Sequence, residues 1–396
     1  MTGYRPQIDQ DWRHPDGPTR NSAAAPQQTL GQREHWTAYA REQQTPALWF
    51  FTEGDDLYEA MLSEIRASTQ TVSMESYIFA SDEIGWRFAV ALGERAAAGV
   101  EVRLHLDAAG ALGRWSASLQ RHLRDRGVDV RWFQRWSWRH PLRYNRRSHR
   151  KLLIVDRHAA FGGGFNIHRE SSMAAIGVSR WRDTHAELSG PLVDEATQSF
   201  DAFWRGRRQS PPIRSSGTQF VSNETRKCRH RIRCLYGEVF DAARQRIYVT
   251  TPYFVPDLST LRRLVAAARR GVDVRVLVPL HSDVPVTQWA ARAIYAALMS
   301  AGVHIHEYLP RMLHAKTVVV DSDWAALGTA NLDYRSFFVN YELILMTTSP
   351  ADCEQLVGHF FHDLSESRRL DAATFAARPW TNKLLEVAGH ALRRWL

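Results

Sequence analysis

One five-position pattern, His-x-Lys-x4-Asp-x6-Gly-x-x-Asn, occurs twice in this chain of 396 residues. The first copy consists of His149, Lys151, Asp156, Gly163 and Asn166, and the second of His314, Lys316, Asp321, Gly328 and Asn331. The similarity extends upstream, where Gly99–Leu104 matches Gly271–Val276 and Gly127–Val130 matches Gly302–Ile305. A pattern repeated at identical internal spacing predicts two similar halves that together build one site.

Each half alternates short apolar stretches with helical stretches rich in Ala and Arg. The segments Lys151–Asp156 and Lys316–Asp321 are short, apolar and β-branched, which predicts buried strands. Strands that alternate with helices are typical of α/β proteins. We therefore expect two similar α/β/α sandwich domains with mixed β-sheets, related by a pseudo-twofold axis and sharing one active site.

The chain length suits two domains of this kind. A polar, proline-containing start predicts a mobile tail, and Pro211-Pro212 with nearby serines predicts a linker. Near the end of the chain, Trp380, Leu384 and Val387 fall on one helical face, so this helix could bind a membrane or pack on its own domain. The expected organisation is a mobile tail at 1–39, a first domain at 40–208, a linker at 209–224, a second domain at 225–375 and an amphipathic helix at 376–396.

The residue types of the repeated pattern indicate chemistry on a phosphodiester. Two histidines can supply a nucleophile and a general acid. Two lysines, together with Asn166 and Asn331, can bind a group with several negatively charged oxygens. Residues two apart on a strand share a face, so each histidine is expected to point the same way as the lysine that follows it. An isolated His-x-Lys pair would be weak support, but its repetition favours catalysis over chance.

Asp183 and Glu342 occupy comparable places after the two copies. Because a catalytic histidine needs a partner on its second ring nitrogen, we expect these carboxylates to orient the histidines. An isolated acidic residue would ordinarily be a solvated surface group. Asp156 and Asp321 complete the catalytic pattern, but each lies far enough beyond its lysine to face the other way on a strand. We interpret both as structural residues that hold a turn or a buried network.

An insertion distinguishes the first half, because the interval from Gly127 to His149 is longer than its counterpart in the second half. No acidic residue occurs from Val130 to Val155, and the insertion is basic and aromatic. Arginine binds phosphate and tryptophan favours the bilayer interface, so we expect contact with an anionic membrane surface. The alternative is a solvated loop whose tryptophans cover the sheet. The candidate headgroup-binding residues are Trp136, Trp138, Arg139, Arg143, Arg146 and Arg147.

From about Leu48 to Leu370 the chain resembles the phospholipase D superfamily. Within it, the chain is most similar to the bacterial cardiolipin synthases that lack N-terminal membrane spans. The segments that carry the likeness are Glu75–Phe79, Gly163–Asn166, Trp181–His185 and Gly328–Phe337. The superfamily usually has serine after the motif glycine, whereas this chain has Gly164 and Thr329. A role for that hydroxyl therefore does not carry over to the first half.

The resemblance implies phospholipase D-like domains and a two-step reaction that uses no metal or other cofactor. His149 would attack the phosphorus of a phosphatidylglycerol to form a phosphohistidine, while His314 protonates the departing glycerol. His314 would then deprotonate the hydroxyl of a second phosphatidylglycerol, which resolves the intermediate to cardiolipin. The lysines and asparagines of the pattern would stabilise the phosphoryl oxygens. The near symmetry of the two copies leaves open which histidine attacks.

The composition favours anionic partners, since a net charge of +9 suits phospholipid headgroups or nucleic acid. The three cysteines form no CxxC pair, which favours a reduced compartment and no structural zinc, and His304 with His306 lacks further spaced metal ligands. No signal peptide and no apolar run of membrane-spanning length is evident. Together with the family resemblance, these features predict a peripheral protein at the cytoplasmic face of the bacterial membrane, with no obligate protein partner.

Three alternative hypotheses remain: a phospholipase D that transfers to water, a phosphodiesterase or nuclease whose basic loop grips nucleic acid, and a non-enzymatic membrane scaffold. The charged residues of both motifs are intact, which argues against a scaffold. The tryptophan-rich insertion and the synthase-like segments argue against nucleic acid as a partner. The acceptor could be a second phosphatidylglycerol, phosphatidylethanolamine, glycerol or water, and the spacing does not distinguish these.

Overall fold

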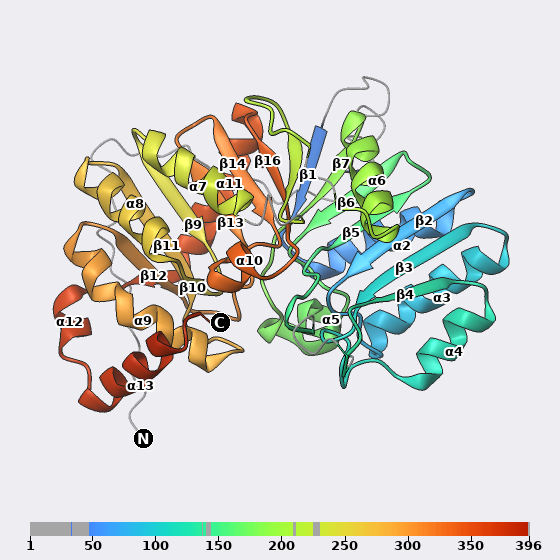
Figure 1. The fold of residues 1–396 in the computed structure, drawn as a ribbon, viewed down its shortest axis with the longest axis horizontal. Helices are drawn as coiled ribbons and strands as arrows, with labels where there is room; N and C mark the ends of the chain where they lie inside the picture. Colours follow the sequence, from blue (N-terminus) through green and yellow to red (C-terminus); the bar gives the residue numbers. More distant parts are fainter. Residues whose placement is uncertain are drawn as a thin grey trace.

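The chain folds into two α/β halves that lie side by side (Figure 1). The computed structural model describes residue 33 and residues 47–136, 138–139, 144–208, 211–224 and 230–394. Each half is built on one mixed sheet with helices packed against it, as the alternation of strand and helix signals predicts.

The first half contains a seven-stranded sheet in the order β1-β7-β6-β5-β2-β3-β4. Strands β2, β3 and β4 are parallel to one another, and the pairs that involve β5, β6, β7 and β1 are antiparallel. The strands are β1 Ala47–Phe51, β2 Thr71–Ser76, β3 Glu101–Asp107, β4 Asp129–Phe133, β5 Leu152–Val155, β6 Ala159–Gly163 and β7 His185–Ser189. The main helices are α2 Gly54–Ala67, α3 Glu83–Ala97, α4 Ala117–Asp125, α5 Met173–Ile176 and α6 Pro191–Trp204.

The second half repeats this plan in an eight-stranded sheet with the order β17-β12-β11-β9-β13-β14-β16-β8. Its strands are β8 Gln219–Ser222, β9 Arg246–Thr250, β11 Asp273–Pro279, β12 His304–Tyr308, β13 Thr317–Val320, β14 Trp324–Gly328, β16 Leu343–Thr347 and β17 Ser367–Arg369, with β10 Phe254–Val255 and β15 Leu332–Asp333 pairing separately. Its helices are α7 Arg231–Ala242, α8 Leu258–Arg269, α9 Pro285–Ser300, α10 Tyr334–Phe338, α11 Pro350–Ser365, α12 Ala372–Ala376 and α13 Trp380–Ala391.

The two sheets share one central core. Alternate residues of β5, such as Leu152 and Ile154, face this core, and so do Val319 of β13 and Leu327 of β14. Helices α6 and α11 complete it, while separate outer cores lie under α2, α3 and α4 and under α7, α8 and α9. Side chains on a strand alternate between faces, so strands buried on both faces read as continuous apolar runs. The two halves are therefore one packed body.

The parallel strands of each sheet end at the same edge. We call this the carboxyl edge: the carboxyl ends of β2, β3 and β4 in one sheet and of β9, β11 and β12 in the other. Strands β5 and β13 are antiparallel to their neighbours β2 and β9, so they begin at this edge. The residues that precede β5 and β13, which include both histidines of the pattern, therefore lie there.

Two boundary expectations need correction. The expected linker at 209–224 includes the mostly buried strand β8, which pairs with β16, and its Val221 joins the core of the second half. The expected mobile tail at 1–39 includes Arg33, whose guanidinium is buried and donates to Glu187 at 2.6 Å and to Glu64 at 3.1 Å. A buried, bidentate ion pair holds this residue on the first half.

Candidate active site

His149 and His314 are each joined to the opposite half of the molecule. The backbone N–H of His149 donates to the carbonyl of Tyr341 at 2.8 Å, and that of His314 donates to the carbonyl of Arg182 at 2.7 Å. Tyr341 immediately precedes Glu342, and Arg182 immediately precedes Asp183. The two halves therefore exchange equivalent strand-like contacts at the carboxyl edge.

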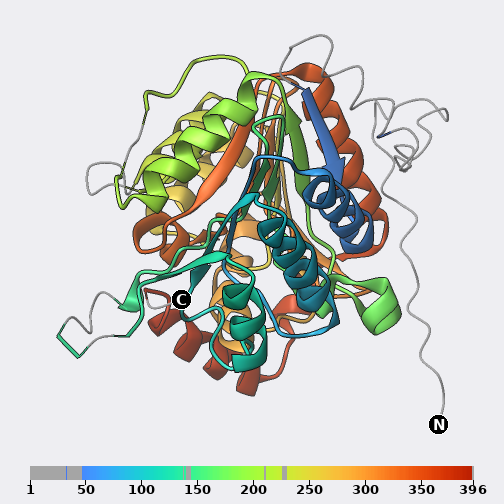
Figure 2. The same cartoon turned by 90° about the vertical axis from the view of Figure 1, so that its right-hand side faces the viewer.

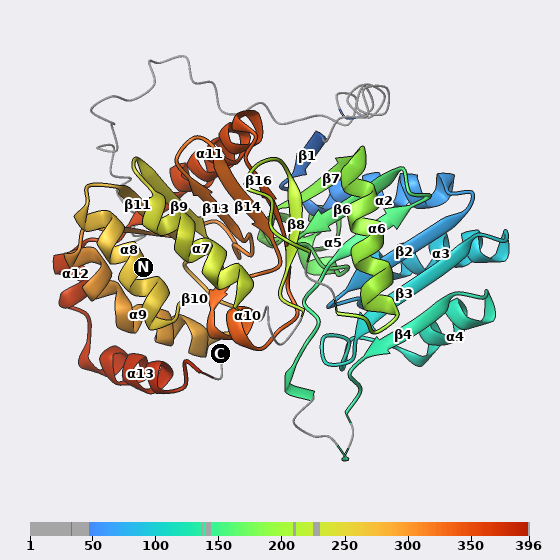
Figure 3. The same ribbon diagram turned by 45° about the horizontal axis from the view of Figure 1, so that its top comes forward.

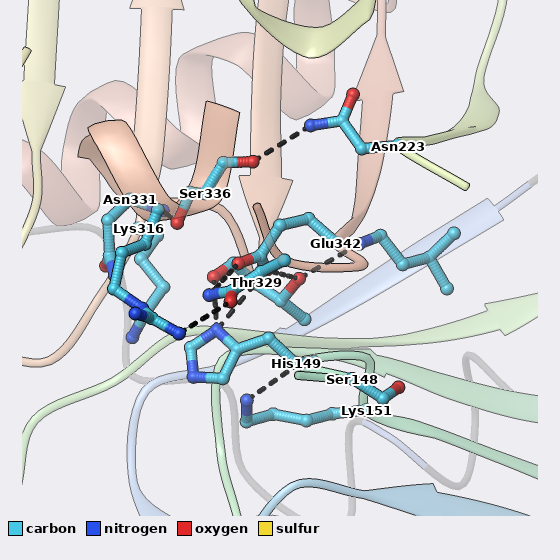
Figure 4. A network of polar contacts seen from close by, with 12 residues as sticks. Ser148, His149, Lys151, Asn223, Lys316, Thr329, Asn331, Ser336 and Glu342 are labelled. Carbon is cyan, nitrogen blue, oxygen red and sulfur yellow. Dashed lines mark hydrogen bonds and ion pairs between the residues drawn. The ribbon is translucent and has the colours of Figure 1, made fainter. Parts of the chain in front are cut away.

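These contacts pair each histidine with the carboxylate of the other half. His149 Nδ1 lies 3.2 Å from Glu342 Oε2 and 3.0 Å from the carbonyl of Thr329, and Figure 4 shows the ring directed at both. His314 Nδ1 lies 2.5 Å from Asp183 Oδ2. A proton on each Nδ1 would satisfy these acceptors and leave Nε2 available for chemistry, and Lys316 Nζ also lies 2.8 Å from His314 Nδ1. The sequence prediction placed each carboxylate with the histidine of its own half. In the folded chain, each carboxylate instead contacts the histidine of the other half.

Burial favours the neutral form of both imidazoles. Burial and the nearby Lys151 lower the pKa of His149, although Glu342 opposes them. Burial and Lys316 lower the pKa of His314 to about 3. Burial alone would raise the pKa of Asp183, but Lys316 and His314 lower it to about 2. A neutral imidazole can attack or accept a proton, and an ionised Asp183 can stabilise the imidazolium that forms on His314.

Two buried lysine ammonium groups lie in the same site. Lys151 and Lys316 are almost inaccessible to solvent, and Lys316 Nζ is 3.6 Å from Asp183 Oδ2. Burial and the charge of Lys316 lower the pKa of Lys151 to about 7, and burial also lowers the pKa of Lys316. Two cations that repel each other away from water are stabilised by an anion between them. A phosphodiester would supply that charge.

The two asparagines of the pattern are both buried. Asn166 Oδ1 accepts the backbone N–H of Ile78 at 3.1 Å, which orients the amide. Asn331 Oδ1 has no hydrogen-bond partner among the described residues. A buried acceptor without a hydrogen bond lowers the stability of the folded protein unless a ligand or a water molecule donates to it. Figure 4 shows Asn331 next to Lys316, near His149.

Asp156 and Asp321 lie at the far ends of β5 and β13, away from the histidines. Asp156 accepts the backbone N–H groups of Thr69, Gln70 and Thr71 at 2.6–2.8 Å. Asp321 makes the equivalent set of bonds to the turn before β9, at 2.7–3.0 Å. These bonds hold the turns next to the strands, in agreement with the structural interpretation. The inclusion of both aspartates among the catalytic residues of the pattern needs correction, because neither belongs to the group around the histidines.

The basic insertion divides into exposed and buried residues. Trp136 and Trp138 are 64% and 73% exposed, Arg139 is exposed and Arg146 is partly buried. Arg147, expected to bind headgroups, is instead buried because it pairs with Asp107 at 3.2 Å and donates to a backbone carbonyl. It holds the chain that enters the site. Arg143 lies outside the described residues.

Aromatic rings line the site, and the sequence prediction did not include them. Tyr77 packs edge-on against His149 with ring centroids 4.8 Å apart, and Trp181 packs on His314 at 5.0 Å. Tyr253 is the counterpart of Tyr77 beside His314 at 6.5 Å. Tyr77 and Tyr253 occupy matching places in the sequence repeat, and that signal could have identified them.

The position after each motif glycine explains one departure from the superfamily pattern. A Cβ at Gly164 would overlap the carboxylate of Asp183, so the absence of a side chain makes room for that group. Thr329, at the equivalent position, hydrogen-bonds through Oγ1 to Glu342. The two orienting carboxylates therefore have different surroundings. No group of three or more metal-ligand side chains suited to hold a metal ion occurs in the described ranges.

The family model described as cardiolipin synthase, PLD-like domain, matches residues 61–204 and again residues 236–364. The chain belongs to this family of phospholipase D-like proteins. The two matches contain the two copies of the motif, which confirms the predicted duplication.

Individual members of the cardiolipin synthase family are similar over most of their length. A cardiolipin synthase of Clostridium perfringens is 32% identical over 358 residues, which cover 85% of this chain and 74% of that protein. Cardiolipin synthase 1 of Staphylococcus aureus is 31% identical over 354 residues, which cover 85% and 71%.

Solved structures support the fold at lower identity. The phosphatidylserine synthase of Haemophilus influenzae has a TM-score of 0.67 at 12% identity and covers 91% of this chain and 100% of that chain. The polyphosphate kinase of Porphyromonas gingivalis has a TM-score of 0.59 at 12% identity and covers 88% and 54%. Together with the two matches of the family model, these likenesses confirm the two-domain, phospholipase D-like fold. None of the described helices combines the length and the apolar character that crossing a bilayer requires.

Proposed function

We propose that this protein is a cardiolipin synthase that transfers a phosphatidyl group from one phosphatidylglycerol to the hydroxyl of another and releases glycerol. The observation that carries the proposal is the crossed pair of His–carboxylate contacts around two buried lysines. Each half supplies one imidazole, and each imidazole depends on the other half for its carboxylate. Such a site is complete only when both domains hold one phosphodiester between them.

In the first step, Nε2 of one histidine attacks phosphorus, the N–P bond forms and the bond to the glycerol oxygen breaks. That oxygen takes a proton from the other histidine. We assign the attack to His149 by family resemblance, and the proton transfer to His314. The short contact between His314 and the ionised Asp183 supports this assignment. A histidine that acts as a general acid must first be an imidazolium, and a neighbouring carboxylate stabilises that cation.

Burial and Lys316 favour a neutral His314, so substrate must help to protonate it. Binding of a phosphodiester adds a negative charge beside two lysines that otherwise lower the pKa of the imidazole. We expect the pKa of His314 to rise when the anion binds. In the second step, neutral His314 removes a proton from the incoming hydroxyl, whose oxygen attacks phosphorus while the N–P bond breaks and frees His149. Lys151, Lys316 and Asn166 would stabilise the phosphoryl oxygens through both steps.

A lipid substrate determines where the enzyme must work. Both the donor and the acceptor are bilayer lipids, so the mouth of the site has to reach headgroups at a membrane surface. We place the protein peripherally at the cytoplasmic face of the bacterial membrane, where its positive charge would be attracted to anionic lipids.

The direct test incubates purified protein with detergent-dispersed phosphatidylglycerol and EDTA, and measures cardiolipin and glycerol. We expect equal amounts of both products, with no product from His149→Ala. His362→Ala, the same substitution at an exposed residue on α11, serves as the matched control. Phosphatidic acid in place of cardiolipin would indicate transfer to water. Full activity in His149→Ala would refute the phosphohistidine.

A further inference from the structure

Helix α13 packs on the protein with its polar side and leaves its apolar side in solvent. Trp380, Leu384 and Val387 are 70%, 59% and 68% exposed, and Leu385 and Leu392 are exposed as well. The buried positions of this helix are Glu386 and Gly389. An ordinary surface helix is oriented the other way, with its apolar stripe toward the core.

Specific contacts hold α13 in this orientation. The carboxylate of Glu386 pairs with Arg378 at 2.8 Å and lies 3.8 Å from Arg292 of α9. Gly389 lies directly against the backbone of α9, where a Cβ would come within 2.7 Å of the backbone nitrogen of Ala290. The absent side chain permits close contact between the two helices. The exposed apolar side is therefore a fixed property of the fold.

The first half carries a second group of exposed apolar side chains. Leu112 follows β3, Trp136 and Trp138 follow β4, and Met173 and Val178 lie on or after α5. Each of these segments leaves the carboxyl edge of the first sheet. Exposed large hydrophobic side chains elsewhere in the described ranges, Val90, Leu258 and Leu309, occur singly.

The two groups lie on the same side of the molecule as the active site. Helix α9 begins at the carboxyl edge, and Gly389 packs near its start, so the end of α13 lies at that edge too. Figure 2 shows α13 in red along the bottom, the segment after β4 in teal at the lower left, and α5 in green at the lower right. In Figure 3, α13 and the segment after β4 both lie toward the bottom of the view, on the same side of the molecule.

We propose that α13 and the apolar group of the first half are two parts of one surface that docks on an anionic phospholipid bilayer around the mouth of the site. This inference rests on the proposed function, because only a bilayer substrate requires the mouth to meet a membrane. Large exposed apolar patches mark interaction surfaces, and a helix with one apolar face inserts into the headgroup region. Two separated contacts orient the site toward the lipid.

Charge favours a bilayer over a second copy of the chain. Exposed Arg135 and Arg139 flank the tryptophans, and exposed Lys383 and Arg394 flank the apolar side of α13. Two identical surfaces that both carry basic residues would repel each other, whereas anionic headgroups would attract them. Tryptophan and arginine together suit the interface between headgroups and acyl chains.

The test measures sedimentation with vesicles of phosphatidylglycerol mixed with phosphatidylcholine. The variant Leu384→Gln/Val387→Gln alters α13, Trp136→Ala/Trp138→Ala alters the first half, and Val90→Gln on α3 is the control. Because all these side chains are exposed, the fold should survive. We expect each double variant to bind about tenfold more weakly, the quadruple variant to bind least, and the control to bind like wild type.

Unchanged vesicle binding in the quadruple variant would overturn the inference. Loss of a dimer in analytical ultracentrifugation, with vesicle binding unchanged, would assign this surface to self-association and overturn it too. Activity on detergent-dispersed phosphatidylglycerol separates this inference from the proposed function. If wild type is inactive there, the proposed function fails whatever the vesicles show. If the variants lose activity on vesicles only, the docking surface is supported.

Discussion

Replacing Asp183 by Asn tests the crossed pairing of histidines and carboxylates. The substitution keeps the shape of the side chain and removes the charge 2.5 Å from His314 Nδ1. Two unit charges with centres about 4 Å apart interact by about 4 kcal/mol at an effective dielectric constant near 20. A loss of that size from the imidazolium of His314 slows proton transfer about a thousandfold. We therefore expect turnover of phosphatidylglycerol to fall by about that factor.

The choice of leaving group shows which histidine Asp183 serves. Phosphatidyl-p-nitrophenol releases a nitrophenolate that departs without a proton, so its first step needs a nucleophile but no general acid. If Asp183 acts through His314, Asp183→Asn keeps a burst of nitrophenolate equal to the enzyme concentration while glycerol release collapses. Glu342→Gln, which alters the partner of His149, should lose the burst.

A matched control and two outcomes make this test decisive. Asp194→Asn removes a carboxylate that pairs with Arg157 on the surface, and it should leave both measurements unchanged. Loss of the burst in Asp183→Asn to the same extent as glycerol release would refute the assignment of Asp183 to the acid. Retention of the burst in Glu342→Gln would refute the assignment of Glu342 to the nucleophile.

Three further predictions concern stability. Asp156→Ala removes the acceptor of three backbone N–H bonds and should lower the free energy of unfolding, measured by urea titration, by about 2–3 kcal/mol. Activity per folded molecule should stay normal. A loss of activity per folded molecule would instead place Asp156 in the active site. Arg150→Met leaves buried Glu75 and Glu224 without their shared cation and should cost about 3–5 kcal/mol, and a fully stable variant would contradict that role. Burial lowers the pKa of His105, His185, His306, His314 and His359 to about 3, so the unfolded chain binds protons that the folded chain does not between pH 6.5 and 3. The free energy of unfolding should therefore be highest above pH 6.5 and should fall on acidification by up to about 1.4 kcal/mol per pH unit for each histidine. Urea midpoints that stay constant from pH 7.5 to 5 would refute this prediction.

The sequence by itself determined the parts of this protein that depend on local spacing. The repeated pattern predicted two domains, the buried strands β5 and β13, and the association of each histidine with a lysine two residues later. Strand alternation also predicted that Asp156 and Asp321 face away from their lysines, whereas the structure places both in turns just beyond the ends of β5 and β13. The family and the α/β class followed from the same residues.

Only the tertiary structure decided how these local pieces meet. Asp183 contacts His314 and Glu342 contacts His149, because the segments before the carboxylates pair with the opposite half, and no interval along the chain encodes that exchange. Burial of Arg147 depends on Asp107, which is distant in sequence.

The outward apolar face of α13 is likewise a tertiary result. Its periodicity indicated an amphipathic helix but not which side would meet the protein. The contacts of Glu386 and Gly389 with neighbouring elements made that choice. Side-chain patterns report which residues share a face, whereas packing between distant segments decides what each face contacts.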